Sequence, residues 1–178
     1  MAKKKKNNLG NRAYKKTGEE MQQYLHFRKR GSVKENGKGN VSHDPRNHEL
    51  MTELREEKVN RVANYIPEQE IIGDPNADLL VVSWGGTYGV VLSVVEKMIA
   101  EGKSVAHAHF RHISPLPKNT EQVLSGHKKI VVCEMNRGQF ANYLRMKHPG
   151  HIYEQYNKVQ GLPFLTAELE NKFNDLLK

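Results

Sequence analysis

Short apolar runs alternate with stretches of helical spacing over the second half of the chain. The runs cover residues 79–84, 104–110 and 129–133, with a weaker run at 151–156, and they are typical of strands buried in a parallel sheet. Helices are predicted from Thr87 to near Gly102, at 120–125, at 138–147, and from an N-cap at Thr166 to Leu177. This alternation predicts an α/β fold with an open, mostly parallel, doubly wound sheet of about four to five strands.

An earlier helix is predicted from Asp44 as N-cap and Pro45 as first helical residue to about Tyr65, with Pro67 ending it. Its expected apolar stripe consists of Leu50, Leu54, Val59, Val62 and Ile66. We therefore expect a basic arm or linker at 1–43, a connecting helix at 44–66 and an α/β domain at 67–178.

The net positive charge of the chain belongs to its beginning. Residues 1–50 hold thirteen Lys and Arg against five Asp and Glu, whereas residues 51–178 hold fifteen of each, so the net charge of +8 belongs to the first fifty. Residues 1–44 contain few bulky apolar side chains, which favours disorder or an extended arm with a short helical patch at 19–27. The four-lysine run either solubilises the terminus, which we favour, or contacts a polyanion.

The remaining composition indicates a cytoplasmic protein. The N-terminus lacks the apolar stretch of a secretory signal, and no run approaches the ~18 apolar residues of a membrane span. Cys133 is the single cysteine, which excludes a disulfide framework and a cysteine metal site within the chain. Its place at the end of a buried strand predicts an inert thiol.

Candidate chemistry gathers where the predicted strands end. The paired glycines of the turn at 84–89 allow a tight turn. Free N–H groups of the following helix could hold an anion, but close packing of strand, turn and helix is favoured. Glu134 and Asn136 follow the third strand, where open α/β folds place ligands, and Glu134 could instead bond the next helix N-terminus. The candidate interface or ligand-approach residues are Gly85, Gly86, Thr87, Tyr88, Arg111, Glu134, Asn136 and Gln139.

His107 and His109 are expected to share one face of a strand, with His112 just beyond it. They could bind a metal ion, but packing is favoured because no acidic residue or cysteine lies nearby in sequence. The chain also lacks G-x-S-x-G, H-E-x-x-H and C-x-x-C, so no catalytic residue, bound cofactor or metal site is assigned to it.

The sequence resembles the last domain of 2-oxoacid:ferredoxin oxidoreductase alpha subunits, closest to the 2-oxoglutarate synthase branch. Five blocks carry the resemblance, namely 39–59, 77–89 with Ser83-Trp84-Gly85-Gly86-Thr87, 105–119, 131–139 and 157–164. The resemblance implies a fold like the C-terminal domain of transketolase that supports subunit assembly. It also implies CoA-dependent oxidative decarboxylation of a 2-oxoacid by the assembled complex, with thiamine diphosphate, magnesium, an iron–sulfur cluster and ferredoxin.

The family pattern has a pyrimidine-binding domain before this region, whereas residues 1–38 resemble no such domain. We therefore expect a split or truncated alpha subunit that is inactive alone and joins a beta subunit and a pyrimidine-binding alpha domain. Two other hypotheses remain. A free-standing module could bind nucleic acid or another polyanion through its arm, although the arm lacks interleaved aromatics. An NAD- or flavin-binding domain rests on fold analogy alone, and the glycine spacing disfavours it.

Overall fold

The computed structural model describes residues 33–178, so the lysine run and the expected helical patch at 19–27 lie outside the described part. The chain divides into two units between Arg61 and Val62.

The described part of the first unit begins with a small hairpin. Strand β1 (Val33–Lys34) pairs antiparallel with β2 (Val41–Ser42). The Asn47 side chain ties the hairpin to the following helix, because its Nδ2 donates to the Lys34 carbonyl oxygen and its Oδ1 accepts from the Asn36 N–H. The sequence pattern did not predict this hairpin.

Helix α3 (Pro45–Arg61) starts as predicted, and Asp44 Oδ1 accepts a hydrogen bond from the N–H of Arg46 at 3.0 Å. It ends sooner than predicted, at Arg61, and a 3-10 turn follows at Val62–Asn64. The expected stripe is not buried: Leu50 and Val59 are 42% and 47% exposed, while Met51 is 2% exposed. The helix itself is thus confirmed, while Leu54 of the stripe is half-buried and Leu50 and Val59 are exposed.

The second unit contains a five-stranded sheet in the order β3-β5-β4-β6-β7. Neighbouring strands are parallel except for β3, which pairs antiparallel with β5. This arrangement confirms the predicted fold class. The strands are β3 (Ile72–Gly73), β4 (Leu79–Trp84), β5 (Val105–Phe110), β6 (Lys129–Glu134) and β7 (Tyr153–Asn157).

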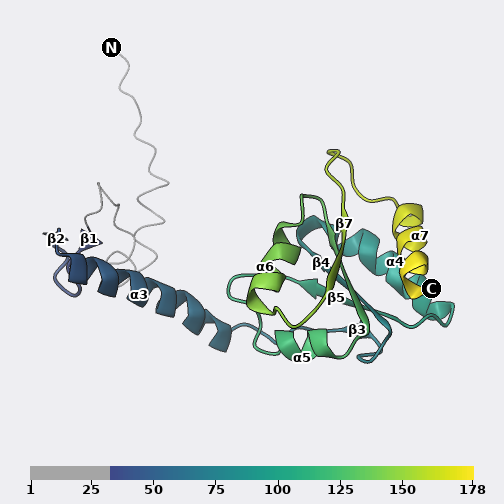
Figure 1. Cartoon of the computed structure of the whole chain (residues 1–178), viewed down its shortest axis with the longest axis horizontal. Coiled ribbons are helices and arrows are strands. Elements are labelled where there is room, and N and C mark those ends of the chain that lie inside the picture. Colours follow the sequence, from purple (N-terminus) through teal and green to yellow (C-terminus); the bar gives the residue numbers. More distant parts are fainter. Residues whose placement is uncertain (1–32) are drawn as a thin grey trace, which may run out of the picture. The chain divides into compact units, whose positions relative to one another are not determined.

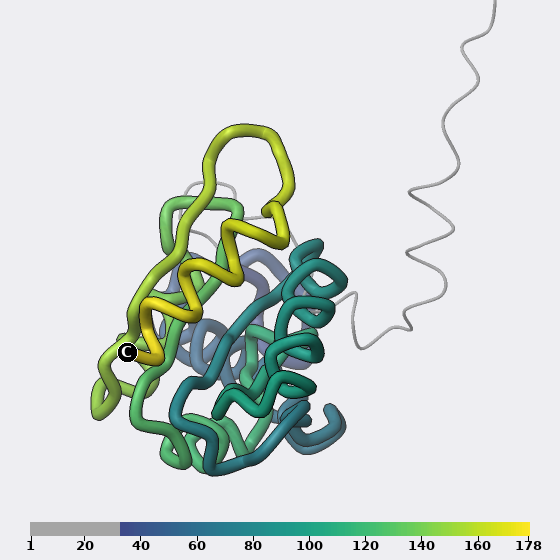
Figure 2. Tube along the Cα trace, turned by 90° about the vertical axis from the view of Figure 1, so that its right-hand side faces the viewer, coloured from purple at the N-terminus to yellow at the C-terminus, as the bar shows by residue number. Residues whose placement is uncertain are grey.

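Helices cover both faces of this sheet (Figure 1). Helices α5 (Thr120–Ser125) and α6 (Gln139–Lys147) pack on one face, and α4 (Tyr88–Ala100) and α7 (Thr166–Leu177) on the other. Figure 2 shows α7 running beside α4. Because successive strand residues point to opposite faces, β4 and β6 contribute buried side chains to both cores, which explains their continuous apolar runs.

The start of α7 differs from the prediction. Leu165, not Thr166, is the N-cap, and the Glu168 carboxylate accepts its N–H at 3.0 Å. The helix start is therefore stabilised by the acidic residue of its first turn, which bonds the N–H of the N-cap residue. Within residues 33–178, no helix combines the length and the apolar character that crossing a membrane would require.

Candidate functional site at the carboxyl edge of the sheet

The order in which strands are added to the sheet changes direction between β4 and β6. From β4 the chain passes through α4 to β5 on one side, and from β6 it passes through α6 to β7 on the other. In open α/β sheets such a switch point lies where ligands and partners approach the carboxyl ends of the strands. The turns after β4 and β6 therefore hold most of the predicted candidate residues.

The turn after β4 is a 3-10 segment at Gly85–Thr87. Gly85 has φ +62°, a left-handed conformation that glycine adopts without strain, and both glycines are exposed. Thr87 is buried, and its hydroxyl donates to the Trp84 carbonyl oxygen at 2.8 Å rather than capping α4. The glycines thus lie at the surface as the candidate role requires, whereas Thr87 closes the turn.

Glu134 lies at the end of β6 and is fully buried. Its Oε2 accepts from the Trp84 indole Nε1–H at 3.1 Å and from the Phe140 N–H at 2.8 Å, and its Oε1 accepts from the Ala141 N–H at 2.9 Å. A carboxylate is favoured here because it satisfies first-turn amides of α6 and complements the helix dipole. Of the two roles that the sequence left open for Glu134, the structure supports the bond to the helix N-terminus.

Asn136 stabilises the same helix start. Its Oδ1 accepts from the N–H groups of Gly138 at 2.8 Å and Gln139 at 3.0 Å. Gly138 has φ +83°, and a Cβ at this position would overlap the side-chain carboxamide of Gln155. The Gln139 side chain is exposed and remains a candidate contact, whereas Asn136 is occupied by the turn.

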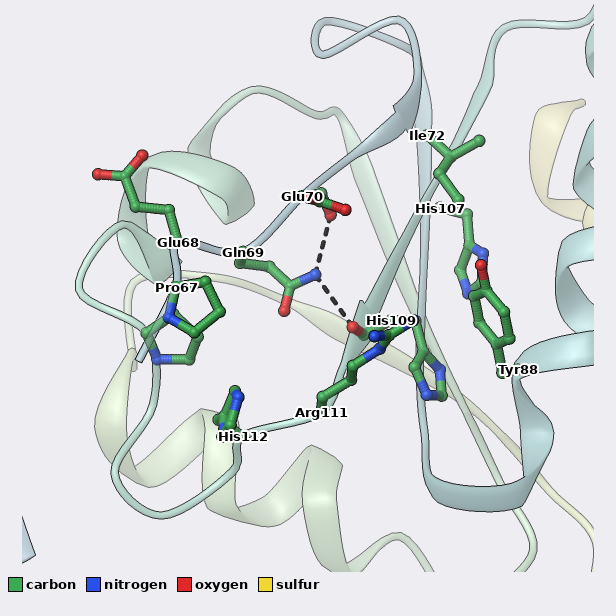
Figure 3. A pocket seen from close by; sticks show the side chains of 11 residues that line it. Pro67, Glu68, Gln69, Glu70, Ile72, Tyr88, His107, His109, Arg111 and His112 are labelled. Atoms are coloured by element: carbon green, nitrogen blue, oxygen red, sulfur yellow. Dashed lines mark hydrogen bonds between the residues drawn. The ribbon is translucent and has the colours of Figure 1, made fainter. Parts of the chain in front are cut away.

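A pocket of about 130 Å³ opens next to β5 rather than at the β4–β6 boundary. One wall comes from the segment before β3 and includes Gln69, and the opposite wall comes from β5 and the start of α4 (Figure 3). Gln69 Nε2 donates to the His109 carbonyl oxygen, and the Gln69 backbone exchanges two hydrogen bonds with the Asn119 carboxamide. The lining residues are Pro67, Glu68, Gln69, Glu70, Ile72, Tyr88, His107, His109, Arg111, His112 and Pro117.

Ser83 links the two strand histidines. Its Oγ lies 2.7 Å from His107 Nε2 and 2.7 Å from His109 Nδ1, so the prediction that both histidines share a face is confirmed. Ser83 and His107 are fully buried, whereas His109 is partly exposed. The serine hydroxyl is therefore shielded from substrate, and the cluster has the geometry of a hydrogen-bonded chain rather than of a nucleophile with its base.

Burial keeps these imidazoles neutral. Desolvation, with a smaller effect from His109, lowers the pKa of His107 from 6.5 to about 4. Desolvation and the nearby Arg111 guanidinium lower the pKa of His109 as well. Both rings consequently act near neutral pH as one donor and one acceptor each.

Arg111 and Tyr88, two of the predicted candidates, meet at this pocket. The Arg111 guanidinium lies 5.8 Å from the centre of the Tyr88 ring, and Tyr88 packs against His109 with ring centres 4.8 Å apart. His112 also lines the pocket but is exposed, and its ring lies apart from those of His107 and His109 (Figure 3). The candidate residues thus fall into two groups: the turns after β4 and β6, and the pocket beside β5.

Sequence reasoning missed Ser83 and the wall at Gln69. The period of two placed His107 and His109 on one face, but the partner strand and its register were needed to bring Ser83 between them. Gln69 lies 50 residues before Asn119 and forms the wall through tertiary contacts that no local pattern announces.

The donor groups present do not suit the metal groups of the family resemblance. Cys133 is the single thiol, it is fully buried, and burial raises the pKa of its thiol, so the chain cannot supply a set of cysteine ligands to an iron–sulfur cluster. Among residues 33–178, His, Cys, Asp and Glu side chains do not gather in threes around a point that could hold a metal ion. Glu134 is engaged by three N–H donors.

The chain matches known proteins in both sequence and fold, although no protein-family model matches it. It is 38% identical over 136 residues to the 2-oxoglutarate oxidoreductase subunit KorA of Mycobacterium tuberculosis, covering 75% of this chain and 20% of that subunit. It is 30% identical over 148 residues to 2-oxoacid:ferredoxin oxidoreductase 1, subunit alpha, of Sulfurisphaera tokodaii, covering 80% and 23%.

A solved structure agrees with these relatives. The 2-oxoglutarate:ferredoxin oxidoreductase from Magnetococcus marinus, with 2-oxoglutarate, coenzyme A and succinyl-CoA bound, superposes with a TM-score of 0.75 and 28% identity, over 82% of this chain and 26% of that chain. The α/β domain is thus homologous to part of the alpha subunit of 2-oxoacid:ferredoxin oxidoreductases, which confirms the resemblance. Two of these three relatives carry 2-oxoglutarate in their names, and the chain spans a fifth to a quarter of the relatives' length.

Proposed function

We propose that this chain is the C-terminal domain of the alpha subunit of a 2-oxoacid:ferredoxin oxidoreductase, acting on 2-oxoglutarate, and that it supports assembly of the complex rather than carrying the reaction. The observation that carries the proposal is the 38% identity over 136 residues to subunit KorA. The remaining length of such a subunit is several times that of this chain, and other chains or domains must supply its chemistry.

The partners that we propose are a beta subunit and a pyrimidine-binding alpha domain, with ferredoxin and CoA used by the whole complex. Thiamine diphosphate, magnesium and the iron–sulfur cluster would then be held by those partners, in keeping with the single buried cysteine of this chain. The cytoplasm is the proposed location.

An apolar loop supports a role in assembly. The segment between β7 and α7 projects from the second unit in both views (Figures 1 and 2). It exposes Val159, Leu162 and Leu165 by about three fifths each, at 60%, 62% and 59%. Apolar side chains grouped on a projecting loop are costly in water and are typical of a surface that another protein covers.

Activity measurements on the separate and combined chains test the proposal. The chain alone should neither bind thiamine diphosphate in calorimetry nor reduce a dye acceptor with 2-oxoglutarate and CoA. Adding it to the beta subunit and the pyrimidine-binding alpha domain should raise 2-oxoglutarate-dependent dye reduction. Replacing Val159, Leu162 and Leu165 by Ser should weaken that gain, and replacing the exposed Met146 by Ser is the matched control. Full activity of the partners without this chain would contradict the proposal.

A further inference from the structure

The pocket beside β5 holds an arginine without a carboxylate partner. Within residues 33–178, the Arg111 guanidinium forms no ion pair, and it lies over the ring of Tyr88 in a cation–π contact. The acidic lining residues do not neutralise it: Figure 3 shows the Glu68 carboxylate pointing away from His109 and Arg111, and Glu70 contributes its backbone oxygen to the Gln69 bond. A guanidinium in this setting is suited to bind an anionic group through two parallel hydrogen bonds.

The hydrogen-bonded chain behind the pocket fixes which group His109 presents. Ser83 has one hydroxyl proton, so it donates to one imidazole and accepts from the other. His107 Nδ1 is buried without a hydrogen-bond partner in the described structure. A bare nitrogen lone pair is tolerated there better than an orphaned N–H, since buried N–H groups without a partner are the rarer case in proteins.

The favoured arrangement therefore runs in one direction. His107 Nε2–H donates to Ser83 Oγ, the Ser83 hydroxyl donates to His109 Nδ1, and the His109 proton is carried on Nε2. His109 lines the pocket and is partly exposed, so its remaining ring nitrogen is available there as a donor. A neutral imidazole held in this tautomer and the adjacent guanidinium give the pocket two kinds of hydrogen-bond donor.

We propose that this pocket is a binding site for the terminal carboxylate or phosphate group of a small molecule, held by the Arg111 guanidinium and the Nε2–H of His109. The size of the pocket suits such a group, since about 130 Å³ is well above the roughly 10–15 Å³ of cavity that a single water molecule needs. The segment at Gln69, fixed by Asn119, forms a wall that is already in place before a ligand arrives. The inference concerns this chain alone and stands whether or not the chain assembles into an oxidoreductase.

Titration of the full chain with sodium acetate and, separately, with sodium phosphate tests the site, at constant ionic strength set with sodium chloride. Histidine side-chain ¹⁵N and ¹H signals are followed by NMR. We expect the His109 signals to move and saturate, with His109 observed as the Nε2–H tautomer. Saturation with acetate alone assigns the site to carboxylates, and saturation with phosphate alone assigns it to phosphates.

Variants separate this site from general charge attraction. Arg111→Gln should weaken binding about tenfold or more, as expected for the loss of a charge-assisted hydrogen bond. Arg137→Gln removes the same charge from another exposed position and should leave binding unchanged. Arg111→Lys keeps the charge but loses the paired donors and should give an intermediate loss of anion affinity. The Trp84 indole signal reports that each variant is folded. Equal weakening by Arg111→Gln and Arg137→Gln, or His109 signals that stay still with both anions, would overturn the proposal.

Discussion

The buried carboxylate of Glu134 joins the two strands at the switch point and should be a strong determinant of stability. Replacing it with Gln preserves the shape but leaves one acceptor oxygen where there were two. The three donors are the Trp84 indole N–H and the N–H groups of Phe140 and Ala141, at 3.1, 2.8 and 2.9 Å. If the Gln oxygen keeps the two bonds of Oε2, its NH₂ group faces the Ala141 N–H, so the Ala141 N–H loses its acceptor and the new NH₂ group has none.

The expected loss is large for one substitution. Each buried donor left without a partner costs about 1–3 kcal/mol, and losing a negative charge at a helix N-terminus costs about 0.3–1 kcal/mol. Relief from burying a charge offsets part of this, so we expect Glu134→Gln to lower the free energy of unfolding by about 3 kcal/mol. That is a sizeable fraction of the total stability of an ordinary domain.

Trp84 makes the assay specific because it is the single tryptophan of the chain and a partner of Glu134. Urea unfolding followed by its fluorescence gives the free energy, and its indole ¹H–¹⁵N signal reports the hydrogen bond directly. Glu154→Gln, at an exposed position on β7, is the matched control and should change stability by less than about 0.5 kcal/mol. A loss below about 1 kcal/mol with an unmoved indole signal would refute the role given to Glu134.

Three further outcomes are expected. The folded state disfavours protonation of His107, whose pKa falls from 6.5 to about 4, so its contribution to stability is complete above pH 6.5 and is lost as the pH falls toward 4. Between pH 6.5 and pH 4 the free energy of unfolding, measured with urea, should fall by about 3 kcal/mol less in His107→Gln than in the wild type. Parallel profiles of this free energy against pH would contradict the prediction. Gly138→Ala should lower the free energy of unfolding by about 1–2 kcal/mol because the φ of Gly138 is +83°. Gly150→Ala, where an added Cβ meets open space, is the control in the same assay, and equal effects of the two substitutions would contradict the prediction. The Cys133 thiol should react with a thiol reagent only at the rate of unfolding, since it is fully buried with a raised pKa, and rapid labelling of the native chain would disprove this.

The sheet was predictable because its signal is local. The apolar runs of β4, β5 and β6 are long enough to stand out, and the helices between them follow from spacing and capping residues. Strand β3 was not predicted because its two residues, Ile72 and Gly73, carry no pattern and pair through tertiary contact with β5. The stripe on α3 shows a related limit: helical spacing identifies an apolar face but not what covers it.

The candidate site was predicted in part. Its position after a strand drew attention to Glu134, but only the structure shows that its carboxylate accepts from the Trp84 indole and from two N–H groups of α6. Arg111 and Tyr88 were candidates without a stated common place, and the structure brings them together in one pocket. The bonding of Glu134 and the meeting of Arg111 with Tyr88 both depend on burial and on the register of neighbouring strands. Burial and register cannot be read from a single stretch of sequence.

Co-elution tests the central claim most directly. The full chain is mixed with a 2-oxoglutarate:ferredoxin oxidoreductase beta subunit and the pyrimidine-binding alpha domain, and the mixture is run on size-exclusion chromatography. If the chain is the last domain of a divided alpha subunit, it should leave its own elution volume and travel with both partners as one complex. A chain that elutes alone at every concentration, while the two partners assemble without it, would contradict the account.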